Sequence, residues 1–336
     1  MPAVEVAAEP TSVSPTPVAP PGAHPTRTGR YGWTARGAAA RMVRTTADLA
    51  ALTRPQQWPK NLLAVPIALL DAPVWTAAAL GRVGWAVLLF TLASSLVYVV
   101  NDVADRRLDA GHPSKRSRPV ASGRVSAATA WVFAATLTAA LAAGVVAGPA
   151  LAWWPVAGYL VLNLAYSRWL KHVPLVDICV VAAGFVLRVL LGYAATAGPV
   201  SVWLLTTVFA TCLLLILGKR RQELVVDGAA HRPALRGYNL NLADQLLTVN
   251  ATVAVIGFLL YLHSDAPVGV YRNALLLSAV PLVLFGISRY LQAVLVRRGG
   301  GDPVRTVLRD RLIVVAAALL AASVGIALLA AQYPSS

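Results

Sequence analysis

The chain has 336 residues, of which 57% are hydrophobic and only 13% are charged, and its formal net charge is +15. This composition excludes an ordinary soluble globular domain and is typical of a polytopic membrane protein. Nucleic acid is not expected as a partner, because cations placed in the loops between apolar segments account for most of the positive charge.

The first 46 residues are rich in Pro, Ala, Thr and Val and contain no long apolar run. They match neither a secretory signal peptide nor a segment that could bury a core. We therefore predict a disordered cytoplasmic tail over residues 1–46 and a single transmembrane domain over residues 47–336.

Nine apolar segments of membrane-crossing length follow the tail, and each is expected to be a helix, because a helix satisfies its own backbone hydrogen bonds in lipid. The first is the weakest, since Pro66 and Pro73 interrupt it. The predicted fold is an all-α bundle of nine transmembrane helices. The segments cover about 54–71, 82–100, 126–147, 150–166, 174–195, 201–217, 246–263, 274–294 and 312–332.

The distribution of Lys and Arg predicts the orientation of the bundle. On one side of the membrane only Arg82 and Arg272 are found, and nearly all other cations fall on the opposite side. By the positive-inside rule the N-terminus and the cation-rich helix ends are cytoplasmic, and the odd number of spans places the C-terminus outside. A homo-oligomer is compatible with such a bundle, although the residue pattern does not specify one.

Residues 101–118 carry the most informative pattern, N-D-V-A-D-R-R-L-D followed by a basic stretch. Asp102, Asp105 and Asp109 follow Asn101 at the end of the second span, and one helix would project all three carboxylates from the same face. Clustered carboxylates repel one another unless a cation lies among them. Because Mg²⁺ binds through one or two carboxylates plus substrate phosphates, the pattern predicts a Mg²⁺–phosphate site. The alternative is a solvated helix end.

Further polar residues lie at the cytoplasmic ends of other spans, where such groups usually face a cavity. We expect these ends to converge on one polar chamber that binds anions. Each group also has an ordinary alternative as a helix start, an aromatic anchor, a loop cation or a surface ion pair. The candidate residues are Arg54, Gln57, Lys60, Asn61, Lys115, Arg118, Tyr166, Lys171, Asp177, Lys219, Arg220 and Glu223.

Arg188 lies inside the fifth span, on the same stripe as Asp177 and Gly184. At 1.5 Å per residue it is about 16 Å from Asp177 along the helix axis, well inside the bilayer. An arginine at that depth costs about 2.5 to 3.5 kcal/mol. It therefore either binds an anionic ligand or has a partner within the bundle.

With these motifs the chain resembles the UbiA superfamily of intramembrane prenyltransferases over about residues 50–330. The resemblance rests on the nine spans, the N-D-x-x-D-x-x-x-D motif and the Y-S-x-x-L-K segment after the fourth span. It implies that the aspartate motif holds Mg²⁺ against a diphosphate, completed by a second aspartate-rich motif after the sixth span. In this chain the second segment reads G-K-R-R-Q-E-L and is mostly cationic.

That departure, together with R-P-x-Q-W-x-K-N and F-V-L-R-V-L-L-G-Y, resembles the decaprenyl-phosphate phosphoribosyltransferase branch. This resemblance implies transfer of 5-phosphoribose from phosphoribosyl pyrophosphate to a polyprenyl phosphate in the bacterial plasma membrane, in the route to cell-wall arabinan. Both substrates are anions, so additional Lys and Arg are expected. One alternative is an aromatic prenyltransferase that uses a polyprenyl diphosphate. A lipid-phosphate transporter ranks lower, because the sequence shows no inverted repeat of broken helices.

The hypothesis gives each group of residues a role. The Mg²⁺ that binds the pyrophosphate is expected to be held by Asn101, Asp102, Asp105 and Asp109. Asp177 is either a second metal contact or the partner of a nearby cation. Membrane lipids surround the bundle, and the polyprenyl chain is expected in an apolar groove between helices. Donor phosphates are assigned to Lys115, Arg118, Tyr166 and Lys171, and the ribose or the lipid phosphate to Gln57, Lys60 and Asn61.

Overall fold

The computed structural model describes residues 45–72, 75–149, 153–226, 233–297 and 301–332, and within these ranges all regular secondary structure is helical. The all-α prediction is therefore confirmed for this part of the chain. The tail predicted over residues 1–46 lies almost entirely outside the described residues.

Seven helices in the described ranges are long and apolar enough to cross a membrane. They match seven of the predicted spans, and the chain is a multi-pass membrane protein. The helices are α3 (Ala77–Ala104), α5 (Ala127–Val146), α7 (Val176–Thr196), α8 (Val202–Val226), α9 (Leu240–Leu260), α10 (Arg272–Leu295) and α12 (Arg311–Gln332). A π-helical turn, Tyr261–Asp265, extends α9.

The other two predicted spans differ from the expectation, so nine full-length spans are not confirmed. The fourth is α6 (Trp153–Arg168), which has 16 residues and is about 24 Å long, shorter than a typical hydrocarbon core. The first is divided into η1 (Pro55–Gln57), α2 (Pro59–Ala64) and η2 (Val65–Asp71). Pro55 and Pro59 are the first residues of η1 and α2, and Pro66 is the second residue of η2. Proline lacks the N–H that a continuous helix requires, so a new helical piece starts at each of these positions.

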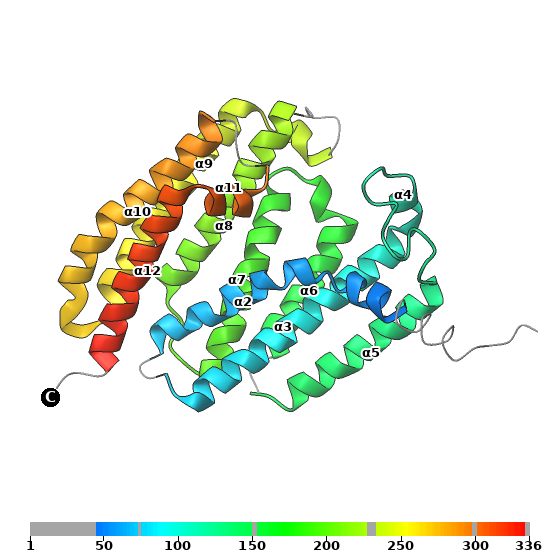
Figure 1. The fold of residues 1–336 in the computed structure, drawn as a ribbon, viewed down its shortest axis with the longest axis horizontal. Helices are drawn as coiled ribbons and strands as arrows, with labels where there is room; N and C mark the ends of the chain where they lie inside the picture. The colour runs from blue at the N-terminus through cyan, green and yellow to red at the C-terminus, as the bar shows by residue number, and fades with distance from the viewer. Residues whose placement is uncertain (1–44, 73–74, 150–152, 227–232, 298–300, 333–336) are drawn as a thin grey trace, which may run out of the picture. The chain divides into compact units, whose positions relative to one another are not determined.

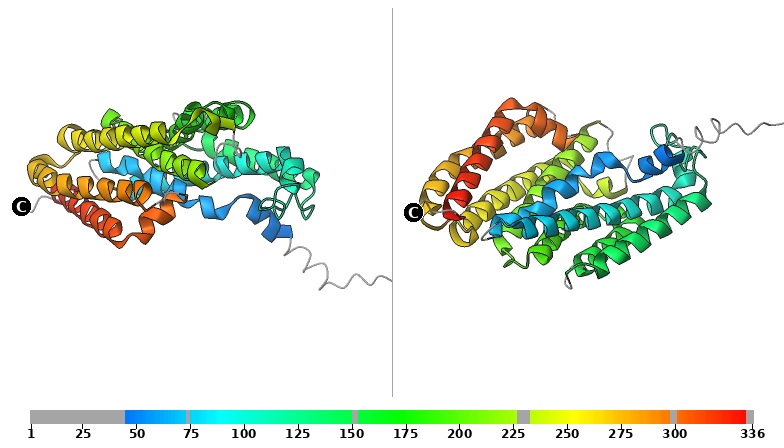
Figure 2. Two further views of the ribbon diagram at one scale, coloured as in Figure 1. Left: turned by 90° about the horizontal axis from the view of Figure 1, so that it is seen from above. Right: turned by 60° about the horizontal axis from the view of Figure 1, so that its bottom comes forward.

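The helices pack in an order that sets α7 and α8 in the centre (Figures 1 and 2). Along one side α3 packs on α5, and along the other α10 packs on α12 with α9 beside them. The divided first segment packs against α7 through η2. A Cβ atom on Gly192 would lie only 2.2 Å from the Val65 carbonyl oxygen, so this close approach requires glycine.

Ion pairs join the ends of neighbouring helices. Arg221 of α8 contacts Asp244 of α9 at 2.5 Å. Arg289 of α10 contacts Asp310, the residue before α12, at 2.9 Å. The cation-rich helix ends are therefore brought together at one end of the bundle, as the alternation of spans predicts.

Candidate active site

The aspartate motif spans a break in the helix rather than one continuous helical face. Helix α3 ends at Ala104, Asp105 has φ −88° and ψ 2°, and the short helix α4 (Arg106–Ala110) follows. The expectation that one helix aligns all three carboxylates is therefore wrong. Asp102 and Asp109 are each 3% exposed, whereas Asp105 is half-buried and makes no ion pair with the other described residues.

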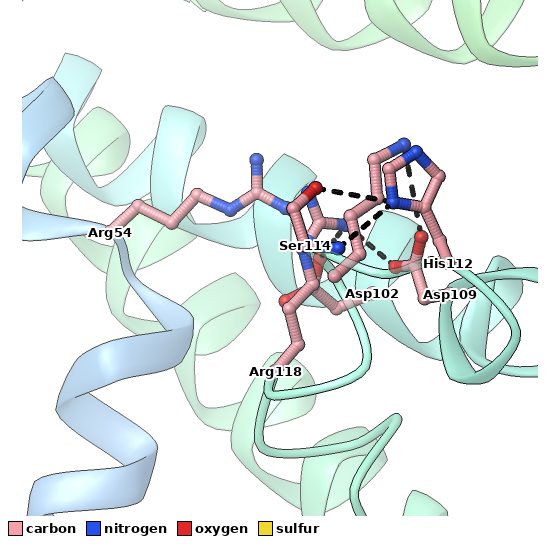
Figure 3. Close-up of polar contacts among 7 residues, drawn as sticks. Arg54, Asp102, Asp109, His112, Ser114 and Arg118 are labelled. Atoms are coloured by element: carbon pink, nitrogen blue, oxygen red, sulfur yellow. Dashed lines mark hydrogen bonds and ion pairs between the residues drawn. The ribbon is translucent and has the colours of Figure 1, made fainter.

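Arg118 joins the two buried carboxylates (Figure 3). Its Nη1 atom lies 2.6 Å from Asp109 Oδ2 and 3.2 Å from Asp102 Oδ1. Lys115 adds a longer contact of 3.9 Å to Asp109. The loop after α4 thus folds back over the motif, because its cations neutralise two carboxylates that would otherwise be buried unpaired.

Arg54 is a third cation at this cluster, which the sequence placed among the polar residues that open the first span without giving it a role of its own. Its Nη2 atom lies 2.5 Å from Asp102 Oδ1, and its guanidinium lies 4.8 Å from the centre of the Tyr98 ring. The Arg54 backbone has φ 50° and ψ 67°, in the left-handed region. The signal in the sequence was its place in the R-P-x-Q-W-x-K-N segment, a group of polar residues at the start of the first membrane segment.

Helix α6 approaches the motif through its C-terminal end. Ser167 donates a hydrogen bond of 3.0 Å to the side-chain oxygen of Asn101. Tyr166 and Lys171, from the Y-S-x-x-L-K segment, are both half-buried at this end of α6. The structure therefore brings this predicted segment next to the aspartate motif.

Arg188 lies in a network inside the bundle and is 5% exposed. Its guanidinium donates to the Asn61 side chain at 2.8 Å, to the Gly184 carbonyl at 2.6 Å and to the Tyr159 hydroxyl at 3.2 Å. Three aromatic rings surround it at 4.8 to 5.0 Å. Of the two interpretations, this geometry fits a partner within the bundle. Asn61 is also 1% exposed and has the same internal role.

Asp177 pairs with Arg220 and lies outside the aspartate cluster. Arg220 Nε lies 3.1 Å from Asp177, and Arg220 Nη1 lies 2.6 Å from Glu223. The Tyr238 hydroxyl donates to Asp177 at 2.9 Å. Burial and then the negative charge of Asp177 raise the pKa of Tyr238, which keeps this hydroxyl protonated. The alternative of Asp177 as the partner of a cation thus fits the structure, and the ligand-binding roles of Arg220 and Glu223 stay predictions.

Two lysines of the predicted chamber have exposed side chains. Lys219 is about half exposed and lies 3.9 Å from Glu223. Lys60 is exposed, and the positive charges of Arg188 and Lys219 both act on its ammonium group. Gln57 is half-buried on the same segment. Lys60 of α2 and Lys219 near the end of α8 are thus accessible cations, and the polar chamber expected from the sequence stays a prediction.

An apolar cavity of about 690 Å³ begins at the aspartate motif and lies between α3, α5 and α6. Asn101 contributes to one part of its wall, and the remainder is almost entirely aliphatic or aromatic, including Leu96, Trp131, Ala139 and Leu164. Its volume is in the range of ligand-binding sites, and it is open to the surroundings, because Trp131 and Leu164 in its wall are about half exposed. A polar centre and an apolar cavity thus meet at Asn101.

The donor chemistry of the motif fits a hard divalent cation. Among the described residues, no three His, Cys, Asp or Glu side chains are arranged to hold a metal. However, two buried carboxylates contact one cationic nitrogen, Arg118 Nη1, so the protein already places a positive charge between oxygen ligands that Mg²⁺ prefers.

The fold and the site together define a multi-pass membrane protein that has a buried carboxylate pair beside an apolar cavity. The profile of the UbiA prenyltransferase family matches residues 62–309. The chain belongs to this family.

Several relatives match most of the chain. A decaprenyl-phosphate phosphoribosyltransferase of Mycobacterium tuberculosis is 37% identical over 284 residues, which cover 82% of this chain and 92% of the relative. A protein of the same name from Corynebacterium glutamicum is 32% identical over 276 residues, covering 79% of this chain and 81% of the relative.

Solved structures share the fold at low sequence identity. A UbiA homologue from Archaeoglobus fulgidus bound to DMAPP and Mg²⁺ has a TM-score of 0.63 and 17% identity, covering 85% of this chain and 99% of that chain. A digeranylgeranylglyceryl phosphate synthase has a TM-score of 0.65 and 14% identity, covering 86% of this chain and 99% of that chain.

Proposed function

We propose that this protein transfers 5-phosphoribose from phosphoribosyl pyrophosphate to a polyprenyl phosphate and releases pyrophosphate. The observation that carries the proposal is the identity of 37% to a decaprenyl-phosphate phosphoribosyltransferase over nearly its whole length. Cationic Lys219 in place of a second aspartate cluster supports it, because two phosphorylated substrates require more positive charge than one diphosphate.

The donor pyrophosphate is assigned to the aspartate motif. Asp102 and Asp109 would hold Mg²⁺, as a UbiA homologue of the same fold is bound to Mg²⁺, with Asn101 and Asp105 at the edge of the site. When bound, Mg²⁺ supplies Lewis-acid stabilisation of the leaving pyrophosphate. Further donor contacts are assigned to Lys115, Arg118, Tyr166 and Lys171.

The acceptor phosphate is assigned to the exposed cations of the chamber, Lys60 and Lys219, with Gln57 near the ribose. The first isoprene units of its chain would lie in the apolar cavity between α3, α5 and α6, which begins at Asn101. In this arrangement the isoprenoid chain of the lipid lies in the apolar part of the bundle while its phosphate head group contacts the polar residues. The relatives name decaprenyl phosphate as their acceptor.

In the proposed reaction an oxygen of the lipid phosphate forms a bond to the anomeric carbon of the ribose. The bond between that carbon and the pyrophosphate oxygen breaks, and pyrophosphate leaves with the electron pair. Because a phosphate monoester is already ionised near neutral pH, no strong general base is needed. The side chains contribute by positioning two anions and by stabilising the charge that develops on the leaving group.

The proposed location is the plasma membrane of a bacterium, with the N-terminus and the active site in the cytoplasm and the C-terminus outside. The positive-inside distribution of Lys and Arg supports this orientation. The product would serve as a lipid-linked pentose precursor of cell-wall arabinan.

The experiment is a transfer assay with purified protein, phosphoribosyl pyrophosphate labelled in the ribose and polyprenyl phosphate. Labelled lipid and an equal amount of pyrophosphate are expected. The competing assay supplies a polyprenyl diphosphate with an aromatic acceptor. If only the second assay forms product, the protein is an aromatic prenyltransferase and the proposal is wrong.

A further inference from the structure

Arg118 contacts both buried carboxylates of the aspartate motif with one atom. Its Nη1 lies 2.6 Å from Asp109 Oδ2 and 3.2 Å from Asp102 Oδ1. A divalent cation that bridged Asp102 and Asp109 would bring a second positive charge to the same two carboxylates. Arg118 would repel such a cation, so the two compete for this carboxylate pair.

Arg54 reaches the same oxygen of Asp102 from another part of the chain, at 2.5 Å. Its backbone is in the left-handed region, with φ 50°, which is unfavourable for a residue with a Cβ atom. Such backbone strain is concentrated at functional sites, where the surrounding structure holds it in place. Two guanidinium groups thus converge on Asp102 Oδ1.

The two arginines differ from the carboxylates in their access to solvent. The side chains of Arg54 and Arg118 are 28% and 27% exposed, whereas those of Asp102 and Asp109 are 3% and 5% exposed. The arginines can therefore turn away while the carboxylates stay in place. A guanidinium that leaves a carboxylate is well suited to a bidentate contact with a diphosphate.

We propose that Arg54 and Arg118 are exchangeable counter-ions. They bind Asp102 and Asp109 until a divalent cation takes those oxygens, and the released guanidinium groups then bind the diphosphate of the donor. The second half rests on the proposed function, and the competition with the cation does not. The exchange makes the cation and the donor bind cooperatively, because each favours the state that the other needs.

The test of the competition measures Mn²⁺ binding to the full-length protein in lipid nanodiscs by electron paramagnetic resonance, with no donor present. Arg118→Gln removes the competing charge, so its Mn²⁺ affinity is expected to rise roughly tenfold over that of the wild type. Arg116→Gln is the matched control, since Arg116 is an exposed cation of the same loop. It is expected to stay within about twofold of the wild type, as screening of an exposed charge predicts.

An unchanged or weaker Mn²⁺ affinity in Arg118→Gln would overturn the proposal, because a merely structural arginine supports the carboxylates and its loss loosens the site. An equal rise in Arg116→Gln would also overturn it, since the effect would then be general electrostatics. If Arg118→Gln does not fold, Arg54→Gln carries the test with the same expected sign.

The second arm measures binding of phosphoribosyl pyrophosphate at saturating Mg²⁺. Arg118→Gln is expected to bind it roughly tenfold more weakly than the wild type, so the two affinities change in opposite directions. Unaltered donor affinity in a variant with tighter Mn²⁺ binding would remove the second half of the proposal. If the wild type does not bind phosphoribosyl pyrophosphate at all, the proposed function fails, while the Mn²⁺ result still decides the competition.

Discussion

The ion pair between Asp177 and Arg220 gives a prediction that separates a structural role from a metal-binding one. Asp177 is 0% exposed and Arg220 is 4% exposed, and Arg220 Nε lies 3.1 Å from Asp177. Among the described residues, Arg220→Met would leave this buried carboxylate with the Tyr238 hydroxyl as its one side-chain partner. Removing one member of a buried pair costs about 3 to 5 kcal/mol.

Asp177→Leu is expected to cost less, about 1 to 3 kcal/mol, because Arg220 keeps its 2.6 Å contact with Glu223. The double variant should be close to the wild type in stability, because apolar side chains of similar volume can replace a buried ion pair at little cost. The coupling free energy between the two positions is then several kcal/mol. Additive single losses would contradict this account.

The assay is reversible unfolding in mixed micelles, followed by circular dichroism as the fraction of denaturing detergent increases. Mn²⁺ binding is measured on the same samples. A structural Asp177 predicts lower stability of Arg220→Met and unchanged Mn²⁺ affinity of folded Asp177→Leu. If folded Asp177→Leu loses Mn²⁺ affinity and keeps its stability, Asp177 is a metal ligand and the structural argument is wrong.

Three further predictions follow from the site and the packing. Chelation of divalent cations should lower the transfer rate roughly a hundredfold, because Mg²⁺ in the proposed role would stabilise the transition state by several kcal/mol, and added Mg²⁺ should restore the rate. Full activity in excess chelator would contradict the metal role. Gly192→Ala should lower the free energy of unfolding by about 1 to 3 kcal/mol in the same assay, because its Cβ would lie 2.2 Å from the Val65 carbonyl oxygen. Gly286→Ala, whose Cβ would meet no atom within 4 Å, should leave the free energy of unfolding unchanged, and equal effects would refute the packing argument. Ala139→Phe, which narrows the apolar cavity, should raise the KM for a long polyprenyl phosphate roughly tenfold and leave the KM for a short isoprenyl phosphate unchanged. An equal change in both KM values would mean that the polyprenyl chain lies elsewhere.

The seven long helices were predictable because each contains a long, predominantly apolar stretch, and length and composition indicate that such a stretch crosses a membrane. The first and fourth spans were less predictable. Prolines at 55, 59 and 66 divide the first, and only packing against Gly192 shows how its pieces are held. The single helical face expected for the aspartates was wrong because the chain turns at Asp105, where helix periodicity stops applying.

The partners of the buried cations were even less predictable from the sequence. Arg188 and Arg220 looked like ligand-binding residues because charges are rare in apolar segments, but both have partners inside the protein. The sequence named Arg54 among the polar residues of the first span but did not reveal its contact with Asp102, because that contact joins positions 48 residues apart. No local pattern encodes such a contact.

The amino-acid sequence by itself determined that this chain is a helical membrane protein with a cluster of carboxylates and cations at one end. These properties depend on composition and short-range spacing, which act without reference to the rest of the chain. The tertiary structure decided which cations neutralise which carboxylates and which stay accessible. That choice depends on distances between helices, and these are set only when the helices pack.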